Sequence, residues 1–543
     1  MSIKKIIAMT WAATAAVTAL NAQSFNPQVE VTNTYRGKLV EVQKAGVPMA
    51  LPDSLLRFDY HVDYAVFDHP YSGSYDFHPY LIEMKPDVSM PAASRLYLNA
   101  GAGYTFAPTV DFAWSSVPGK KFSGTLYDDL DGYYGPMKGG FAKGYKGSLF
   151  TNRLGATGHY DGGTFKAVAD VAYDFLGSAD SLYSHSFHAV DFSLRGGTAH
   201  DPFRKTNVYA GISVSYGNDT FGGFASDKSV RALDMDMSLG FTTPHRHYPG
   251  NLWAVDVELE TVRLSGAADA AGLRISALPK YVIERDNLHL AIGVCLSTMP
   301  GIADESYNNS SKLLYPDVHA EYQFNKDRMA VFAHLSGGER LDSYRDYLRL
   351  NPYFTVDDYF WADASVIRAD LNLGLRGCAF RKLEYKADWG YAVYESVLNE
   401  TLGVTGAPAF VYSDHALMYY GAELAWRGYK FDFNSAFKYR HAFNGVEGLD
   451  PAALTGRFDM TYRWTERLAA SVYGRGSSKR TMASAAVEVP GWFDLGLKAE
   501  YQFTSGLSFW LGGDNLLCSN IYEYAFRARK CMCVTAGICL NIR

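Results

Sequence analysis

The histidines of this chain do not fall into a known catalytic or metal-binding motif. The 543-residue sequence contains no HExxH, GxxxxGK[ST], GxSxG or GxGxxG pattern. His185 and His188 are three residues apart, so in a strand they would face opposite sides and could not share a metal. His245 and His247 could share a face at a short turn, but no third zinc ligand is evident. We therefore expect no catalytic residue, no metal site and no cofactor.

The acidic run Asp128–Gly132 loosely resembles the opening of a calcium-binding loop. It lacks the downstream Glu at the spacing that such a loop requires. A solvated acidic turn in a surface loop is the preferred interpretation, and a cation site in that loop is the alternative. We expect that the protein is not an enzyme, although a catalytic pair assembled from distant strands is the remaining alternative.

The composition excludes several other classes of protein. Aromatic residues make up 15% of the chain, which argues against disorder. The net charge is −6, so there is no basic surplus with which to bind nucleic acid. The six Cys form no CxxC pair, which argues against a disulfide scaffold.

The first residues predict a cleaved export signal over residues 1–22. Lys4 and Lys5 precede the mostly apolar run Ile6–Leu20, and a small residue stands before the expected cut at Gln23. An N-terminal anchor helix is the alternative. No later apolar run approaches the length of a spanning helix, which excludes a helical membrane protein.

Strict alternation of apolar and polar residues dominates the rest of the chain. In Phe493–Phe503 the odd positions are all apolar and the even positions are polar or glycine; Tyr429–Arg440 alternates in the same way. Such runs predict strands with one apolar face, and they match the ~9–11 residues that cross a bilayer rather than the ~5–6 of soluble strands. After Trp253–Glu260 the apolar Val262 and Leu264 break phase, which predicts a bulge or the exit from the membrane.

Short turns recur along the chain and give the expected strand number. Ten such turns on one side predict an all-β fold, a large transmembrane antiparallel β-barrel of 22 strands, with 20 as the alternative. The first strand is expected within 57–84. Residues 23–55 would then form a short periplasmic or lumen segment, and residues 56–543 the barrel. The expected turns are Ala107–Thr109, Asp161–Gly163, His200–Arg204, His245–Gly250, Glu284–Asn287, Asn325–Arg328, Arg381–Lys382, Arg427–Tyr429, Thr465–Arg467 and Thr504–Gly506. The expected surface loops are Ser116–Lys146, Met299–Lys312, Gly338–Ala364 and Leu398–His415.

Charged residues on the polar faces are the candidates for the lumen wall. Charges of both signs recur there, which suits a wet lumen or a wall that packs against inserted loops. The charges around the turn at Arg381 are expected to neighbour one another across it. The lumen-facing candidates are Arg368, Asp370, Arg376, Glu384, Lys386, Asp388, Lys430, Asp432, Lys438, Lys498 and Glu500.

The size, the export signal, the strand number and Gly513–Leu517 before the last strand resemble TonB-dependent outer-membrane receptors of Bacteroidetes type. The resemblance covers the barrel and implies a receptor or transporter. Two features depart from that family: the segment before the barrel is too short for a full plug domain, and Arg543 replaces the usual terminal aromatic residue.

Together these observations predict a multi-pass β-barrel of the bacterial outer membrane that takes up a substrate or lets solutes pass. A non-conducting scaffold of an envelope complex is the first alternative, motivated by aromatic loops such as 357–361, and an outer-membrane enzyme is the second. The expected partners are membrane lipid and lipopolysaccharide, together with a surface lipoprotein or a periplasmic protein, and no nucleic acid.

Overall fold

The computed structural model describes residues 95 to 542, with gaps. The gaps are 117–120, 137–145, 181–182, 224–227, 301–313, 326–327, 357–359, 361, 404–406, 444–445, 483–486, 526 and 528–530. The expected export signal, the 23–55 segment and the strand expected within 57–84 lie outside the described residues.

Within those ranges the chain forms strands and one short helix. They are β1 (Leu96–Tyr104), β2 (Thr109–Ser115), β3 (Phe122–Pro136), β4 (Lys146–Asp161), β5 (Phe165–Ala179), β6 (Tyr183–Thr198), β7 (Asn207–Gly223), β8 (Ser229–Pro244), β9 (Asn251–Gly266), β10 (Ala270–Arg285), β11 (Leu288–Thr298), β12 (Leu314–Asn325), β13 (Met329–Leu341), α3 (Tyr344–Leu350), β14 (Ala364–Ala379), β15 (Leu383–Leu402), β16 (Pro408–Arg427), β17 (Phe431–Ala442), β18 (Leu454–Arg463), β19 (Leu468–Ser477), β20 (Arg480–Met482), β21 (Val487–Val489), β22 (Trp492–Thr504), β23 (Leu507–Asp514) and β24 (Cys533–Ile542).

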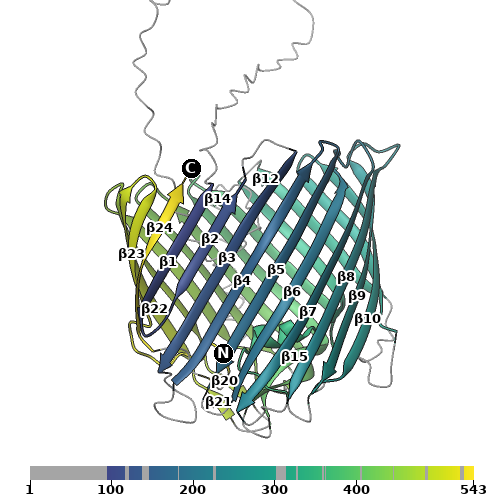
Figure 1. Cartoon of the computed structure of the whole chain (residues 1–543). Helices are drawn as coiled ribbons and strands as arrows, with labels where there is room; N and C mark the ends of the chain where they lie inside the picture. Colours follow the sequence, from purple (N-terminus) through teal and green to yellow (C-terminus); the bar gives the residue numbers. More distant parts are fainter. Residues whose placement is uncertain are drawn as a thin grey trace, which may run out of the picture. The chain divides into compact units, whose positions relative to one another are not determined.

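Twenty-two of these strands form one antiparallel sheet that closes into a barrel (Figure 1). Each strand pairs with the next from β1 to β19, and then through β22, β23 and β24. The last strand returns to the first, with Leu96 opposite Ile542 and Tyr104 opposite Val534. The predicted fold class and strand number are therefore confirmed.

The expected strand number is right although two expected strand positions are wrong, because one strand was missed and one was expected in excess. Residues 116–146 were expected to be a surface loop, but they contain β3 (Phe122–Pro136), which pairs with both β2 and β4. Because β1 closes directly on β24, the barrel needs no strand before Leu96. The acidic run Asp128–Gly132 accordingly lies inside a strand and not in a solvated turn.

The two ends of the barrel differ in their connections. At the end where β1 begins and β24 ends, here the short-turn end, the connections include 162–164, 286–287 and 505–506. At the other end, the long-loop end, they include 342–363 and 515–532. The turn expected at Ala107–Thr109 belongs to the long-loop end, because it joins β1 to β2. Residues 398–415 were expected to be a loop, but all except 403–407 belong to β15 and β16.

The outer face of the barrel is apolar and exposed. On β6 the even-numbered side chains Val190, Phe192 and Leu194 are 53%, 42% and 43% exposed, whereas Asp191 points inward. Large exposed side chains of this kind recur on nearly every strand, which far exceeds what a soluble protein leaves in water. A closed sheet with such a face is suited to hydrocarbon, since its last strand pairs with its first and leaves no open edge. Among the described residues no helix is long and apolar enough to span a membrane.

Val262 and Leu264 were expected to mark either a bulge or the exit of the strand from the membrane, and the bulge is wrong. β9 pairs with β8 and β10 without any register shift, so both side chains face inward like Glu258 and Glu260. They are 1% and 2% exposed and belong to an apolar cluster inside the barrel. The inner face therefore changes from charged to apolar toward the long-loop end.

A repeated three-strand brace stiffens the inner wall. In each case a Tyr lies over the Gly directly opposite it on the next strand and hydrogen-bonds an Asp one strand further on. Tyr209 covers Gly240 and donates to Asp256 at 2.5 Å. The same arrangement joins Tyr127, Gly155 and Asp170, then Tyr419, Gly390 and Asp370, and finally Tyr473, Gly496 and Asp514. Only Gly leaves room for the ring, so each brace requires all three residues.

A Trp makes the equivalent brace where the barrel closes. Trp510 on β23 lies over Gly537 on β24, and its indole N–H donates to the Asn99 side chain on β1 at 2.7 Å. This contact links the last two strands to the first. It therefore stabilises the closing seam in addition to the backbone hydrogen bonds.

The braces predict a marked difference between two glycines. A Cβ at Gly240 would lie 2.0 Å from the Tyr209 ring, whereas a Cβ at Gly158 would meet only a carbonyl oxygen at 4.0 Å. We expect Gly240→Ala to displace Tyr209 from Asp256 and to lower the free energy of unfolding by about 1–3 kcal/mol, as overpacking does. Gly158→Ala should lower the free energy of unfolding by less than a third of that amount. Urea unfolding of the protein in lipid or detergent measures both, and equal midpoints would contradict the brace.

Candidate functional site: the closed lumen

The connection between β13 and β14 folds into the barrel and crosses its lumen. Its helix α3 contacts β6 through Arg345 and Asp191, and β16 through Tyr347 and Tyr412. These two strands are ten places apart in a circuit of 22, so they stand on nearly opposite walls. The surface loop expected at Gly338–Ala364 is therefore instead a segment that obstructs the lumen.

The start of α3 is fixed locally. The backbone N–H of Ser343 donates to the Asp346 carboxylate at 3.0 Å, as at many helix starts. A helix of seven residues is too short to be stable alone. Packing holds it instead, because Tyr344, Tyr347 and Leu348 are buried on one face.

Tyr344 anchors the helix to a buried polar group on the wall. Its hydroxyl donates to Asp219 at 2.7 Å, and His185 Nδ1 lies 3.3 Å from the same carboxylate oxygen. His185 Nε2 donates to the Pro352 carbonyl, since that oxygen can only accept. Burial, with the Asp219 carboxylate, raises the pKa of Tyr344 well above its ordinary value, so the phenol stays protonated and keeps donating.

Arg345 forms the most heavily charged contact of the segment. Its guanidinium binds Asp191 through two nitrogens at 2.5 and 2.8 Å, and Asp174 at 2.9 Å. Arg153 of the wall lies 2.7 Å from Asp174 and 3.2 Å from Asp191. Arg153 also lies 3.8 Å from Asp170, so two cations are shared among three carboxylates. Arg345 Nε is buried and has no hydrogen-bond partner among the described residues.

Aromatic packing holds α3 on the opposite wall. The Tyr347 and Tyr412 hydroxyls are 2.7 Å apart, and Tyr412 also donates to the Asp363 carbonyl at 2.7 Å. The rings of Tyr347, Phe354, Phe360 and Phe410 pack with centroids 4.8 to 6.0 Å apart. Phe360 therefore packs inward, and does not form part of an exposed docking loop. Residues 357–359 and 361 of that expected loop lie outside the described residues.

The connection between β23 and β24 adds to the closure. Asn351 at the end of α3 donates to the Ala525 carbonyl at 3.2 Å. Arg527 pairs with Asp180 at the end of β5 at 2.7 Å, and both side chains are almost fully buried. The long-loop end is thus closed by two segments that bind each other and the wall.

Below this closure the lumen wall is charged. Lys280 on β10 pairs with Asp317 on β12 at 3.1 Å. Arg376 on β14 pairs with Glu321 on β12. Such a surface is suited to water or to a polar solute, and unsuited to a dry core.

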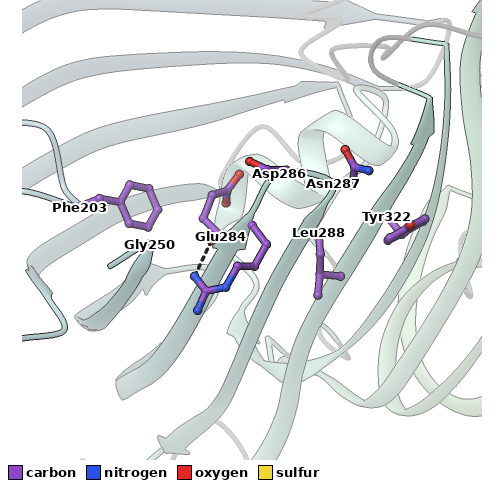
Figure 2. Close-up of a pocket in the computed structure, with 8 residues that line it drawn as sticks. Phe203, Gly250, Glu284, Asp286, Asn287, Leu288 and Tyr322 are labelled. Atoms are coloured by element: carbon purple, nitrogen blue, oxygen red, sulfur yellow. Dashed lines mark hydrogen bonds between the residues drawn. The ribbon is translucent and has the colours of Figure 1, made fainter. Parts of the chain in front are cut away.

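Two cavities stand at different places on the barrel. One of about 210 Å³ lies beside α3, with a mixed charged and apolar lining: Asp129, Thr151, Asn152, Arg153, Asp174, Phe175, Leu176, Phe187, Arg345, Leu348 and Arg349. The other is an open depression of about 650 Å³ at the short-turn end, shown in Figure 2. It is lined mainly by the β10–β11 turn with Phe203, Gly250 and Tyr322. Only the first touches the closing segment.

The predicted lumen residues lie on the polar face, but they do not form a single site. Asp370 accepts from Tyr419, and the Lys438 ammonium lies 4.5 Å from the centre of that Tyr419 ring. Lys498 lies 4.8 Å from the centre of the Trp510 ring, and Glu500 accepts from Ser508 at 2.8 Å. These charges therefore take part in bracing the wall.

The charges around the turn at Arg381 do neighbour one another across it, but the ion pairs reach to other strands. Arg376 lies opposite Lys386, and it pairs instead with Glu321 on β12. Lys386 lies 3.5 Å from Glu423 and 3.9 Å from Asp388. The remaining candidates lie elsewhere on the wall: Arg368 pairs with Glu395 at 3.4 Å, Asp432 pairs with Arg463, Glu384 stands opposite Cys378, and Lys430 immediately precedes β17.

Sequence reasoning did not identify the residues that close the lumen. Asp191 and Arg345 are 154 positions apart, and no local spacing connects them. One signal was present in the sequence. Four aromatic residues lie within eleven positions, which is unusual for a solvent-exposed loop: Tyr344, Tyr347, Tyr353 and Phe354. His185 and His188 do face opposite sides, as expected, since His185 is buried and His188 bonds the exposed Tyr173.

Comparison with known proteins places the fold among outer-membrane receptors. No protein-family model matches the chain, and no curated protein matches it. Solved structures do match. The siderophore receptor PirA from Acinetobacter baumannii has a TM-score of 0.60 at 10% identity, over 83% of this chain and 81% of that one.

Two further structures give the same result. The pyoverdine-bound FpvA of P. aeruginosa has a TM-score of 0.62 at 10% identity, over 83% of this chain and 72% of its own. The copper transporter OprC has a TM-score of 0.60 at 13% identity, over 83% and 80%. At such identities the likeness establishes the barrel fold that these receptors share.

The two arginines of α3 provide a matched test of the closure. Arg345 is 18% exposed and holds two carboxylates, whereas Arg349 is 75% exposed and has one loose contact with Asp346 at 3.7 Å. We expect Arg345→Ala to leave Asp174 and Asp191 with too little positive charge and to loosen α3. Amide hydrogen exchange at Asn351, whose N–H bonds the Tyr347 carbonyl, should accelerate at least tenfold. Arg349→Ala should change it less than twofold, and equal effects would contradict the anchoring role of Arg345.

Proposed function

We propose that this protein is an outer-membrane receptor that takes up a solute through the barrel, with the α3 segment closing the lumen until the solute binds. The observation that carries the proposal is the nature of the closure. Arg345, Tyr344 and Asn351 hold the segment through ion pairs and hydrogen bonds, and such contacts can be exchanged for contacts with a ligand. The charged wall between the segment and the short-turn end supports a polar path.

The cavity beside α3 couples solute binding to release of the segment. Arg345 and Asp174 line it and also form the ion pairs that hold α3. The buried Nε–H of Arg345, unpaired within the described chain, would donate a hydrogen bond to an oxygen atom of a ligand. A solute that binds there changes the free energy of the closed state directly, which is what ligand gating requires.

The wider proposal follows the resemblance to TonB-dependent receptors of Bacteroidetes type. It includes energised uptake, a reduced plug, an export signal over 1–22 and a barrel domain within 56–543. Membrane lipid and lipopolysaccharide would contact the exposed apolar band, and a surface lipoprotein or periplasmic protein would bind at one of the two ends. The lumen-facing charges, such as Asp370 and Lys438, would line the solute path.

One observation favours a second function, a non-conducting scaffold. The core around α3 is apolar and fully buried, with Tyr344, Tyr347 and Phe354 at 0%, 0% and 1% exposure. Moving such a core into water is costly, at about 25 cal/mol for each Å² of apolar surface. A permanently closed barrel would suit a structural role in an envelope complex.

Single-channel conductance tests passage through the lumen. We expect the native barrel in a planar bilayer to be silent, because the α3 segment and the β23–β24 connection close its lumen. Replacing Tyr344, Arg345 and Tyr347 together with Ala should produce discrete conductance steps, while Arg349→Ala stays silent. Heat-modifiable gel migration checks that every variant folds.

The outcomes separate the two functions. Silence in the folded triple variant would overturn solute passage. If gently solubilised membranes also return the native barrel with partners in stoichiometric amounts, the scaffold is supported. Recovery of the native chain in the soluble periplasm would defeat both, since each requires the outer membrane.

A further inference from the structure

Three histidines stand side by side on the inner face of three consecutive strands. His289 on β11, His319 on β12 and His334 on β13 form a row in which neighbouring ring centres are 5.6 Å apart. His319 lies directly opposite His334 in the strand register. Outward residues of opposite parity, such as Ile292 and Tyr322, are exposed, so the imidazoles face the lumen.

We propose that this histidine row is an open binding site for a divalent transition-metal ion such as Cu²⁺, Ni²⁺ or Zn²⁺. Imidazole nitrogen is a preferred ligand of these ions. Two rings bound to one ion at ~2.0 Å have centres a little over 5 Å apart, which the spacing in the row nearly matches. Directly opposed cross-strand residues, with Cβ atoms ~4.5–5.5 Å apart, are well placed to share an ion.

Carboxylates stand behind the two outer rings. Glu284 lies 2.5 Å from His289 Nδ1, which leaves His289 Nε2 to bind a metal. Asp317 pairs with Lys280 at 3.1 Å. It lies 3.8 Å from His334 Nε2, beyond hydrogen-bond distance, so among the described residues only His289 of the row has a hydrogen-bonded carboxylate. A carboxylate on the far nitrogen is the usual companion of a metal-binding His, because it fixes the ring and raises its basicity.

The central ring is the ligand that the two candidate pairs share. Within the part of the chain that the structure describes, His319 makes ring contacts and no hydrogen bond. No group of three or more His, Cys, Asp or Glu side chains among the described residues converges on one point as a finished metal site does. The row therefore binds an ion through His319 and one neighbour, and lumen water fills the other positions.

This inference does not depend on solute passage. The row lies away from α3, nearer the short-turn end, where His289 is the second residue of its strand. An ion could bind there whether or not the lumen opens. A negative conductance result would therefore leave the proposed metal site standing, and a negative metal-binding result would leave the proposed solute passage standing.

Titration calorimetry with Cu²⁺ or Ni²⁺ tests the site on the full chain, purified in detergent without a histidine tag. We expect one ion per barrel. His319→Ala should weaken binding at least tenfold, because it removes the shared ligand. His289→Ala and His334→Ala should each weaken it less, because one pair remains. His159→Ala, on the inner face of β4 and remote from the row, is the matched control and should leave the affinity unchanged.

A second measurement identifies the ligands. Electron paramagnetic resonance of bound Cu²⁺ should show coupling to two imidazole nitrogens in the native protein and to fewer in His319→Ala. The turn histidines His245 and His247, with ring centres 6.3 Å apart, are the rival site. If His245→Ala abolishes binding and His319→Ala does not, or if no variant changes the affinity, the proposal is overturned. Heat-modifiable migration confirms that each variant is folded.

Discussion

The constraint on which this structure depends is that no backbone polar group may be left unpaired in hydrocarbon. An open sheet of 22 strands would have two edge strands with unpaired N–H and C=O groups, and the pairing of β1 with β24 removes both edges. Closure in turn fixes the side chains, since successive residues must point alternately to lipid and to lumen. The exposed aromatic and aliphatic band and the charged inner wall are two consequences of one geometric requirement. The Trp510 brace adds a side-chain contact at the seam that every other strand pairing relies on.

A barrel of this width leaves an interior that side chains from the wall alone cannot fill. The chain uses two solutions at two levels. In the charged part, aromatic rings lie over glycines and bind carboxylates two strands away, which stiffens the wall. Toward the long-loop end the inward residues become apolar, as at Val262 and Leu264, and the α3 segment fills the space. The change in inner-face chemistry therefore marks where the lumen is closed.

The sequence predicts features that depend on neighbouring residues, and it does not predict contacts between residues far apart in the chain. Alternation along a strand is a property of neighbouring residues, so the fold class and the inner face of residues such as Asp370 and Lys438 could be predicted. β3 was missed because Asp128–Gly132 has the composition of a turn, and only its pairing with β2 and β4 shows it to be a strand. The partners of Arg376 and Lys386 could not be predicted, because Glu321 and Glu423 come from strands whose register depends on distant turns. The closure at Arg345 was beyond local patterns for the same reason.

The choice of contacts at the closure bears on how it can open. A partly buried ion pair adds little net stability, because the cost of desolvating both charges offsets much of their attraction, but it strongly favours one geometry. Arg345 between Asp174 and Asp191 therefore sets where α3 sits more than how tightly it is held. The stability of the packed helix comes from burial of the apolar face formed by Tyr344, Tyr347 and Leu348. The hydrophobic effect is non-directional, so this burial does not fix one orientation of α3. A ligand that competes for the charges removes the specific position first, after which the apolar face can repack elsewhere. Under the proposed function, this division of position and tightness between two kinds of contact would let a bound solute release the closed lumen.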